Sequence, residues 1–305
     1  MALKFNLMFP MRAVKHYSKW IDGGDFGGVA KFVEDNGFDG FSMSEHPYPS
    51  KKWLANGGHH AFDPFVSLSM AAQATERIQL ITYVMVAGYR SPYLAANSAA
   101  SLDLLSGGRL TLGMAAGYLE AEFDALGADF KRRGKLLDEA IAAMRATWLG
   151  IDHDGPEFGR TDHISLPLPA QHGGPPIWIG GNSKAAQRRV VELADGWMPM
   201  AQSSEMAAIT KTPPLEDIDE LRTMITAQNK KRVEAGKPDI DVSFVPFEKD
   251  LLHSGDSVGF CEAVAPRLRE YEDAGVTWIT IEPSSRSFDE FKRDISMMGE
   301  KLISN

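Results

Sequence analysis

The sequence contains a single cysteine, Cys261, among its 305 residues. One cysteine cannot form an intramolecular disulfide, and it excludes every zinc site that is built on two thiolates. No run of residues approaches the roughly 18 apolar positions of a membrane-spanning helix, and the apolar start of the chain is too short for a signal sequence. These absences predict a cytoplasmic protein.

Basic residues are also scarce relative to acidic ones. Lys and Arg number 32 against 41 Asp and Glu, which gives a formal net charge of −9 and a sequence pI near 5.4. This balance argues against a sequence-independent grip on nucleic acid phosphates. With 44% hydrophobic and 24% charged residues, the composition is that of an ordinary folded globular protein.

Three common functional motifs are missing. The sequence has no Walker phosphate loop, no Gly-x-Gly-x-x-Gly dinucleotide turn and no Gly-x-Ser-x-Gly nucleophile elbow. It also has no repeat of solenoid length and no low-complexity tract. The sequence therefore gives no motif-based indication of a P-loop NTPase, a Rossmann dinucleotide-binding protein or an α/β-hydrolase.

Short strand-like runs alternate with helical stretches along the whole chain. This alternation is typical of parallel strands joined by helices, and about eight such runs predict a (β/α)8 TIM barrel. We expect one domain over residues 1–305, with an insertion at about 201–240. The predicted strands are Leu3–Phe9, Phe38–Met43, Ile78–Val86, Arg109–Met114, Pro176–Gly180, Gly196–Met200, Asp241–Phe247 and Trp278–Glu282.

Helix signals separate these strands. The apolar spacing of Phe26–Asn36 predicts a helix that ends at a left-handed glycine, Gly37. Asp63-Pro64 predicts an N-cap followed by a proline in the first turn. The same periodicity predicts helices over Leu136–Leu149 and over Glu262–Ala274, the latter ending at Gly275.

Two segments interrupt the alternation. Ser44–His60 is a long loop after the second strand, and Gln202–Pro214 opens an insertion before a polar helix near Leu215–Glu234. In a barrel both would lie over the carboxyl-terminal mouth, where substrate walls are built. The alternative is that they are ordinary surface loops.

The turn Gly180-Gly181-Asn182-Ser183 follows the fifth strand and precedes a helical stretch, Lys184–Leu193. Glycines allow close approach of a ligand, and the amides at a helix start attract phosphate. The position late in a barrel favours a phosphate site. The alternative is a turn that only caps the helix.

Histidines supply the other candidates. His46, with Glu45 beside it, follows the second strand, where an imidazole could exchange a proton near neutral pH. The alternative is a structural histidine. His59-His60 and the Asp152–Asp154 cluster lack the spacing of metal ligands, so we interpret both as solvated loop residues. Cys261 is interpreted as a small buried side chain.

Longer segments carry a family resemblance. They are Gly37–His46, Ala74–Leu80, Ser101–Gly113 with its Leu-Ser-Gly-Gly-Arg motif, Glu122–Gly127, and Ile177–Ser183 through Asp195–Trp197. Together they resemble the bacterial luciferase-like family of flavin-dependent oxidoreductases over nearly the whole chain.

The resemblance implies a flavin ring at the carboxyl-terminal mouth of the barrel. In this family the third strand often contains a non-prolyl cis peptide beneath the ring, and the matching bond here is Tyr83-Val84. The turn Gly180–Ser183 matches a segment near the cofactor phosphate. His46 with Glu45 matches an acid–histidine pair beside the reacting carbon in deazaflavin-dependent members.

The cofactor has two candidates. The region from Thr75 to Gly150 most resembles the branch that uses coenzyme F420, a deazaflavin that carries hydride. The alternative is reduced FMN, which reacts with O2 in monooxygenases and requires a flavin reductase as partner. The resemblance also implies a homodimer.

Two features of the sequence bear on the substrate: its differences from the family's sugar-phosphate dehydrogenases, and the apolar residues near the strand ends. The sugar-phosphate dehydrogenases of the family carry a Trp and an acid where this chain has Ser50 and Tyr118, which argues against a sugar phosphate. Side chains near the strand ends predict a pocket for a small, largely apolar substrate, and the alternative for about half of them is ordinary core. They are Met43, Phe62, Met85, Tyr118, Trp197 and Met200, with Tyr83 beside them.

We therefore expect hydride transfer between F420 and an apolar carbonyl, alcohol or activated alkene, with His46 moving the proton. Three alternatives remain: an FMN-dependent monooxygenase, a flavin-binding protein without catalysis, and a metal-dependent barrel hydrolase. The last lacks paired ligands in the sequence.

Overall fold

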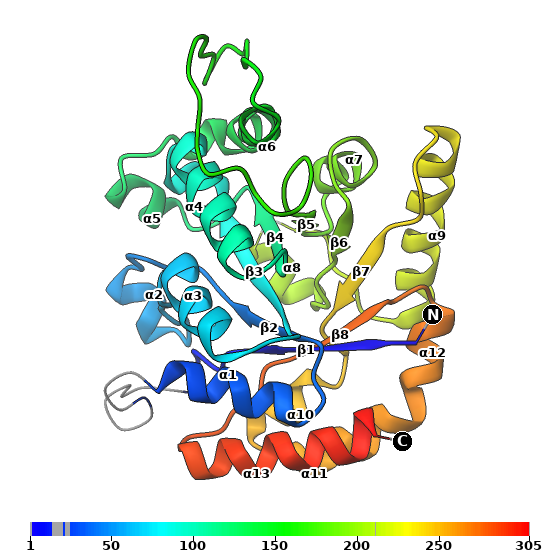
Figure 1. Cartoon of the computed structure of the whole chain (residues 1–305). Helices are drawn as coiled ribbons and strands as arrows, with labels where there is room; N and C mark the ends of the chain where they lie inside the picture. Colours follow the sequence, from blue (N-terminus) through cyan, green and yellow to red (C-terminus); the bar gives the residue numbers. More distant parts are fainter. Residues whose placement is uncertain (1, 14–20, 22–24, 211, 305) are drawn as a thin grey trace.

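The computed structural model describes residues 2–13, 21, 25–210 and 212–304. Within this part, eight parallel strands form a closed barrel in chain order, and β8 pairs with β1. Helices surround the strands (Figure 1). The strands are β1 Lys4–Met8, β2 Gly40–Met43, β3 Gln79–Val86, β4 Leu110–Ala115, β5 Ile177–Gly180, β6 Gly196–Met198, β7 Asp241–Phe244 and β8 Trp278–Ile281.

This architecture confirms the predicted (β/α)8 barrel. Each predicted strand overlaps an observed one, and most of the observed strands are shorter than predicted at one or both ends. The helices are α1 Phe26–Asp35, α2 Lys51–Ala55, α3 Pro64–Ala74, α4 Pro92–Leu105, α5 Glu120–Ala125, α6 Arg133–Leu149, α7 Lys184–Glu192, α8 Ser204–Thr210, α9 Ile218–Glu234, α10 Lys249–Ser254, α11 Ser257–Val264, α12 Leu268–Asp273 and α13 Phe288–Met298.

Two predictions about helices were wrong. The stretch Glu262–Ala274 is not one helix, because a 3-10 turn at Ala265–Arg267 separates α11 from α12. Pro266 has no amide hydrogen with which to continue the helical ladder. The segment Ser44–His60 is not entirely loop, since it contains α2.

The predicted helix ends are confirmed. Gly37 follows α1 with φ of 88° and Gly275 follows α12 with φ of 96°, the left-handed conformation that glycine adopts without strain. Asp63 caps α3 by accepting hydrogen bonds from the amides of Phe65 and Val66 at 2.9 and 3.2 Å. Short-range signals therefore located the boundaries of α1 and α3.

The barrel interior combines aromatic and polar layers. Ile81, Trp178, Met198 and Trp278 form an apolar cluster against which Tyr83 and Val84 pack. A polar layer lies beside it. Asn6 Nδ2 donates to Ser42 Oγ and Thr280 Oγ1, and the hydroxyls of Ser243 and Thr280 bond each other. The interior is thus filled by side chains, as in other small parallel barrels.

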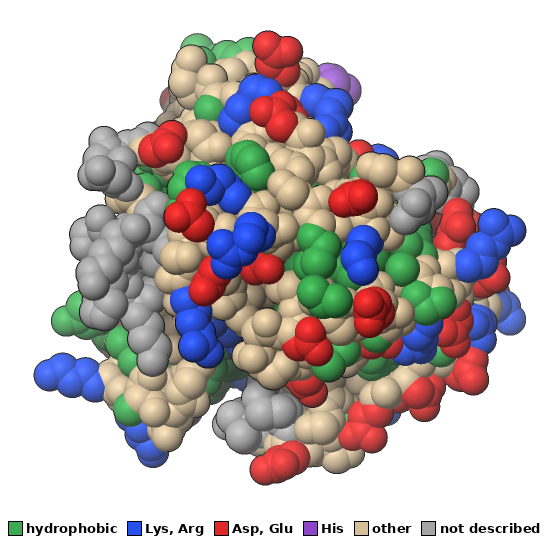
Figure 2. Space-filling view, turned by 90° about the horizontal axis from the view of Figure 1, so that it is seen from below, with side chains coloured by type: hydrophobic (Ala, Val, Ile, Leu, Met, Phe, Trp, Pro, Cys, Tyr) green, Lys and Arg blue, Asp and Glu red, His purple; other side chains and the backbone are tan. Residues whose placement is uncertain are grey.

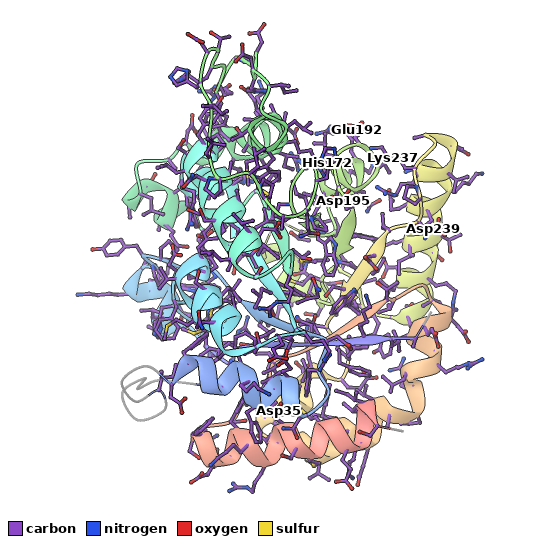
Figure 3. The ribbon with its side chains drawn as sticks, in the orientation of Figure 1. Asp35, His172, Glu192, Asp195, Lys237 and Asp239 are labelled. Atoms are coloured by element: carbon purple, nitrogen blue, oxygen red, sulfur yellow. The ribbon has the colours of Figure 1, made fainter. Side chains whose placement is uncertain are left out.

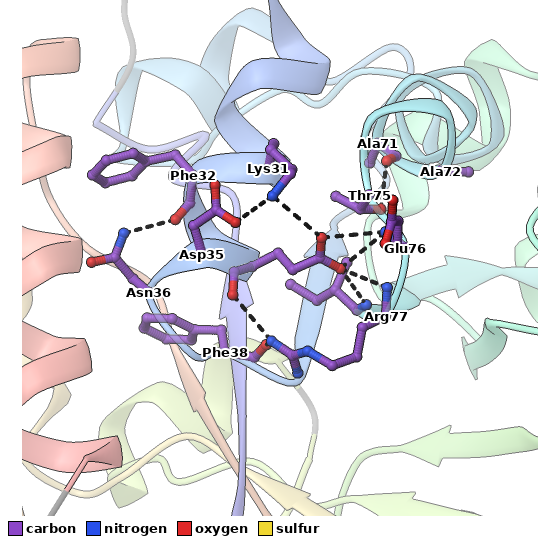
Figure 4. A network of polar contacts seen from close by, with 12 residues as sticks. Lys31, Phe32, Asp35, Asn36, Phe38, Ala71, Ala72, Thr75, Glu76 and Arg77 are labelled. Carbon is purple, nitrogen blue, oxygen red and sulfur yellow. Dashed lines mark hydrogen bonds and ion pairs between the residues drawn. The ribbon is translucent and has the colours of Figure 1, made fainter.

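One buried carboxylate joins α1 to the start of β3 (Figure 4). Glu34 accepts hydrogen bonds from the amides of Glu76, Arg77 and Ile78 at 3.1, 2.7 and 2.8 Å. Burial acts to raise the pKa of Glu34, but these amides outweigh it and lower that pKa. The contact fixes the end of the barrel opposite the carboxyl-terminal mouth.

Helix α7 is held at its carboxyl end. Lys237 Nζ donates to the carbonyl of Glu192 at 2.5 Å, and Figure 3 shows these two residues near each other. Arg232 donates to the carbonyls of Val190 and Ala194, both at 2.8 Å. Cations suit a helix carboxyl terminus. The amino end of α7 follows the carboxyl end of β5 and therefore lies at the barrel mouth.

Charge is spread over the surface. Figure 2 shows acidic and basic side chains interspersed on one face, with smaller hydrophobic groups among them. No helix in the described ranges is long and apolar enough to span a membrane.

Candidate active site

His46 lies just beyond β2 and is almost completely buried, with 8% of its surface exposed. Its Nδ1 is 3.0 Å from Oε2 of Glu122, a residue of α5. The same carboxylate accepts the amide of Tyr48 at 3.0 Å and the hydroxyl of Tyr89 at 2.9 Å. An ionised carboxylate only accepts hydrogen bonds, so Nδ1 carries the proton and Nε2 remains for chemistry.

The charge state of Glu122 supports this assignment. Burial acts to raise the pKa of Glu122, but the hydrogen bonds from His46, the Tyr48 amide and Tyr89 together lower it. Glu122 is therefore ionised near neutral pH. The acid expected to pair with His46 was its neighbour Glu45, but the carboxylate that bonds the imidazole is that of Glu122.

Glu45 serves a different set of partners. It forms an ion pair with Arg90 and accepts the amide of Val86 at 2.6 Å. Burial raises the pKa of Glu45 to about 7, against the lowering effect of Arg90. Glu45 thus connects the end of β2 to the end of β3, one strand further round the barrel.

His59 contradicts its interpretation as a solvated residue. It is buried, and its ring meets that of His46 edge to face with centroids 4.8 Å apart. Its Nδ1 donates to the carbonyl of His60 at 3.0 Å. Burial lowers the pKa of His59 to about 3, and the neighbouring His46 adds to this effect. The imidazole of His59 is therefore neutral across the physiological range.

The Asp152–Asp154 cluster lies elsewhere. Asp152 and Asp154 are exposed as expected, but His153 is half-buried and lies 3.4 Å from Glu139. Within the described ranges, no three His, Cys, Asp or Glu side chains gather in a way that could hold a metal ion. Cys261 is buried, as predicted, and burial raises the pKa of its thiol to about 11.

Strand β3 carries the feature expected beneath a flavin ring. The peptide bond Tyr83-Val84 is cis, and the pairing of β3 with β4 shifts register between Thr82 and Met85. The prediction of this bond is confirmed. Burial raises the pKa of Tyr83, partly offset by hydrogen bonds with Ser243 and Thr280 inside the barrel.

The Gly180–Ser183 turn lies against this bend. A Cβ on Gly180 would be only 3.3 Å from Cγ1 of Val84, and Gly181 has φ of 103°. Only glycine fits these two requirements without adjustment. The cis peptide and the glycine turn, far apart in the sequence, therefore meet at the barrel mouth.

The acceptor groups of this turn point into the protein. Trp197 Nε1 donates to the carbonyl of Gly181 at 2.9 Å, and Gln187 Nε2 donates to that of Asn182 at 2.9 Å. The Asn182 side chain bonds both backbone groups of Met200 at 2.8 Å. No described residue accepts from the backbone amides of Asn182 or Ser183. The turn thus fits a phosphate group, which needs donors and excludes acceptors.

The predicted pocket residues occupy different environments. Met43, Met85 and Trp197 are completely buried in the main core, and Phe62 packs against that core. Tyr118 and Met200 are 42% and 39% exposed. Only the last two present substantial surface, and a substrate role for the set stays a prediction.

Sequence reasoning overlooked Glu122, which bonds His46, Arg90, which pairs with Glu45, and Trp53, whose ring centroid lies 5.9 Å from that of His46. Glu122 stands in the first helix after β4, so an acid following a barrel strand was the available signal. Its pairing with His46 spans 76 positions. A single sequence does not reveal a contact at that separation.

A closed parallel barrel with a buried histidine–carboxylate pair and a glycine turn at its carboxyl-terminal mouth has the organisation of a barrel enzyme. The chain belongs to the bacterial luciferase-like family, because the model of luciferase-like monooxygenases matches residues 3–222. The expected family is therefore confirmed, and with it membership of a family of oxidoreductases.

Two relatives differ in the cofactor that they use, one depending on F420 and the other on flavin. The chain is 32% identical over 177 residues to an F420-dependent glucose-6-phosphate dehydrogenase of Nocardia farcinica, covering 56% of this chain and 51% of that one. It is 31% identical over 145 residues to the oxygenase component of a flavin-dependent trigonelline monooxygenase of Acinetobacter baylyi, covering 45% and 40%. An uncharacterized protein of Mycobacterium tuberculosis is 29% identical over 273 residues, covering 86% and 85%.

The fold likeness extends over the whole chain. An F420-dependent secondary alcohol dehydrogenase, solved with an F420–acetone adduct, superposes with a TM-score of 0.74 over 99% of this chain and 98% of that one. The sequence identity is 16%, so this likeness shows the barrel fold alone.

Proposed function

We propose that this protein transfers hydride between coenzyme F420 and a small, largely apolar carbonyl, alcohol or activated alkene. The observation that carries the proposal is the contact of Gly180 with Val84 at the barrel mouth to which the histidine–carboxylate pair also belongs. The candidate phosphate-binding and ring-binding elements then lie at the ends of β5 and β3, the two neighbours of β4, and the candidate proton-transfer group follows β2 at the same mouth.

The residues of the turn would hold the cofactor phosphate. The amides of Asn182 and Ser183, at the amino end of α7, would donate to it, and the bend at Tyr83-Val84 would support the ring. When bound, the cofactor supplies or accepts the hydride. The protein contributes orientation and the exclusion of water.

His46 would move the proton. Glu122 fixes its Nδ1–H, so Nε2 faces the reaction. Reduction of a carbonyl leaves an oxygen that requires one proton, which Nε2 of the imidazolium donates. In alcohol oxidation the same nitrogen accepts the hydroxyl proton. The ionised Glu122 stabilises the imidazolium form that arises in this direction.

The alternative is a two-component monooxygenase that uses reduced FMN and O2. The match to the model of luciferase-like monooxygenases favours it. In that case a flavin reductase would be the partner, and oxygen consumption would accompany substrate oxidation. We place either enzyme in the cytoplasm, as the sequence predicts.

A turnover assay separates the two. Purified protein is given a panel of primary and secondary alcohols with F420 under anaerobic conditions, and reduction of F420 is followed spectroscopically. A parallel assay supplies FMN with a flavin reductase and measures oxygen uptake. Hydride transfer to F420 supports the proposal. Substrate-coupled oxygen uptake without F420 turnover contradicts it.

We also propose a homodimer formed through α4. Leu94 and Leu105 are 67% and 82% exposed, and they lie on the same face of the helix as Asn97. The side chain of Asn97 donates to the carbonyl of the exposed Leu166 at 3.1 Å. Sedimentation velocity should give a dimer, and Leu94→Glu with Leu105→Glu should give a monomer. A monomeric wild type contradicts this assembly.

A further inference from the structure

Three aromatic rings surround the candidate catalytic histidine. The ring centroid of His46 lies 5.9 Å from that of Trp53, 4.8 Å from that of His59 and 6.2 Å from that of Tyr118. Trp53 and Tyr118 also contact each other edge to face, at 5.9 Å. We call these four residues the aromatic cluster. A substrate that reaches His46 must pack against these rings.

The cluster has few polar atoms to offer. Trp53 Nε1 donates to the carbonyl of His59 at 3.2 Å, and Nδ1 of His59 donates to His60. Nδ1 of His46 is bonded to Glu122. No described residue bonds the hydroxyl of Tyr118. Ring faces and edges, with the Tyr118 hydroxyl and the Nε2 atoms of His46 and His59, are therefore what the cluster presents.

The indole of Trp53 is held by its own loop. A Cβ on Gly58 would lie 2.3 Å from Nε1 of Trp53, so the indole rests directly on the backbone of Gly58. The amide of Trp53 is bonded to the N-cap residue Ser50 at 3.2 Å. Helix α2 contributes no buried residue. Trp53 can thus be changed without opening the hydrophobic core.

We propose that Trp53 and Tyr118 determine the substrate class and select a flat aromatic or conjugated alcohol or carbonyl compound. A flat π system packs edge to face or offset against such rings, with a gain beyond the area it buries. A polyol would need more hydrogen-bonding partners than the three polar atoms of the cluster that no described residue bonds, Tyr118 Oη and the Nε2 atoms of His46 and His59. The inference rests on the proposed function, because it takes His46 to be the group that the substrate meets.

Two small alcohols test the preference. Benzyl alcohol and cyclohexylmethanol share a carbon skeleton and a hydroxyl, but only the first has a flat ring. The saturated ring is the more hydrophobic, so burial of apolar surface alone would favour cyclohexylmethanol. Dissociation constants are measured by ligand-observed NMR. We expect benzyl alcohol to bind about three- to tenfold more tightly. Equal or reversed affinities overturn the proposal.

Variants locate the origin of the preference. Trp53→Leu should abolish the ratio of the two constants, and Trp53→Phe should restore part of it. Gly58→Ala should reduce the ratio by displacing the indole. Tyr118→Phe should weaken both ligands and leave most of the ratio. Leu54→Ala is the matched control, since Leu54 is 42% exposed on the same short helix as Trp53 and should change nothing.

The measurements keep this inference separate from the proposed function. Thermal unfolding of each variant establishes that it is folded. An unchanged ratio in folded Trp53→Leu overturns the inference, even where the wild type turns over F420. Failure of the wild type to bind F420 or to transfer hydride overturns the proposed function, whatever the ratio of the two alcohols.

Discussion

Oε2 of Glu122 lies 3.0 Å from Nδ1 of His46, although the two residues are 76 positions apart in the chain. Because β2 and β4 are both parallel members of the barrel, the loops after them meet at the same mouth. The contact assigns the proton to Nδ1 of His46 and leaves Nε2 for the proton transfer that we propose.

Replacement of Glu122 by Gln should lower kcat by about 10- to 100-fold. The amide keeps the size of the side chain but removes the negative charge that stabilises the imidazolium of His46. Cofactor affinity should change little, because Glu122 is not part of the glycine turn. The measurement is the pH profile of kcat, which should differ from that of the wild type.

The control is Glu120→Gln, an exposed carboxylate on the same helix. It should retain the wild-type rate and profile. A wild-type pH profile in Glu122→Gln would exclude the positioning role.

Replacement of His46 by Ala should cost on the order of 10²- to 10⁴-fold in kcat if the imidazole is the acid or base. Cofactor binding should persist. The measurement is single-turnover hydride transfer together with a cofactor titration. A loss of less than about threefold, with cofactor affinity unchanged, would remove His46 from the mechanism.

Replacement of Gly181 by Ala should weaken cofactor binding by about tenfold, because the left-handed backbone that orients the amides becomes strained. The matched control is Gly236→Ala, which also has positive φ (71°) but has open space around it and lies between α9 and β7. Both variants should lose about 1–2 kcal/mol of unfolding free energy. Equal cofactor affinities in the two variants would argue against a phosphate site at the turn.

His59 should make the protein sensitive to acid. Its pKa is about 3 in the folded protein against 6.5 ordinarily, so between these values the unfolded chain binds a proton that the native protein does not. Stability is therefore fully present above about pH 6.5 and falls as pH decreases, by about 2 kcal/mol near pH 5.

The check is urea unfolding at several pH values for the wild type and for His59→Asn. The asparagine can still donate to the His60 carbonyl but does not titrate. The slope of unfolding free energy against pH should flatten in the variant over this range. Parallel slopes would show that His59 is not the group responsible.

The fold could be predicted because its signals are local. Strand runs, the Asp63 cap and the glycine after α1 each act within a few residues, and together they gave the barrel. The failure at Pro266 is local too, since the apolar spacing of the flanking helices continues across a residue that breaks the ladder. The helical turn at α2 carries no buried face, so it left no periodic pattern to detect.

The site was predicted only in part. His46 and the glycine turn could be identified because each follows a strand end in the sequence. The Glu122 partner and the burial of His59 could not, because both arise from packing between loops that follow different strands. Adjacent position favoured Glu45 as the acid, but its side chain points to Arg90 and the Val86 amide instead.

The central claim is that the barrel mouth binds a deazaflavin. Paired equilibrium titrations of the purified protein with F420 and with FMN, each oxidised and anaerobically reduced, test it most directly. The account predicts tight binding of F420, weak binding of FMN in both states, and loss of F420 affinity in Gly181→Ala. Preferential binding of reduced FMN would contradict it and identify the protein as the oxygenase component of a two-component system.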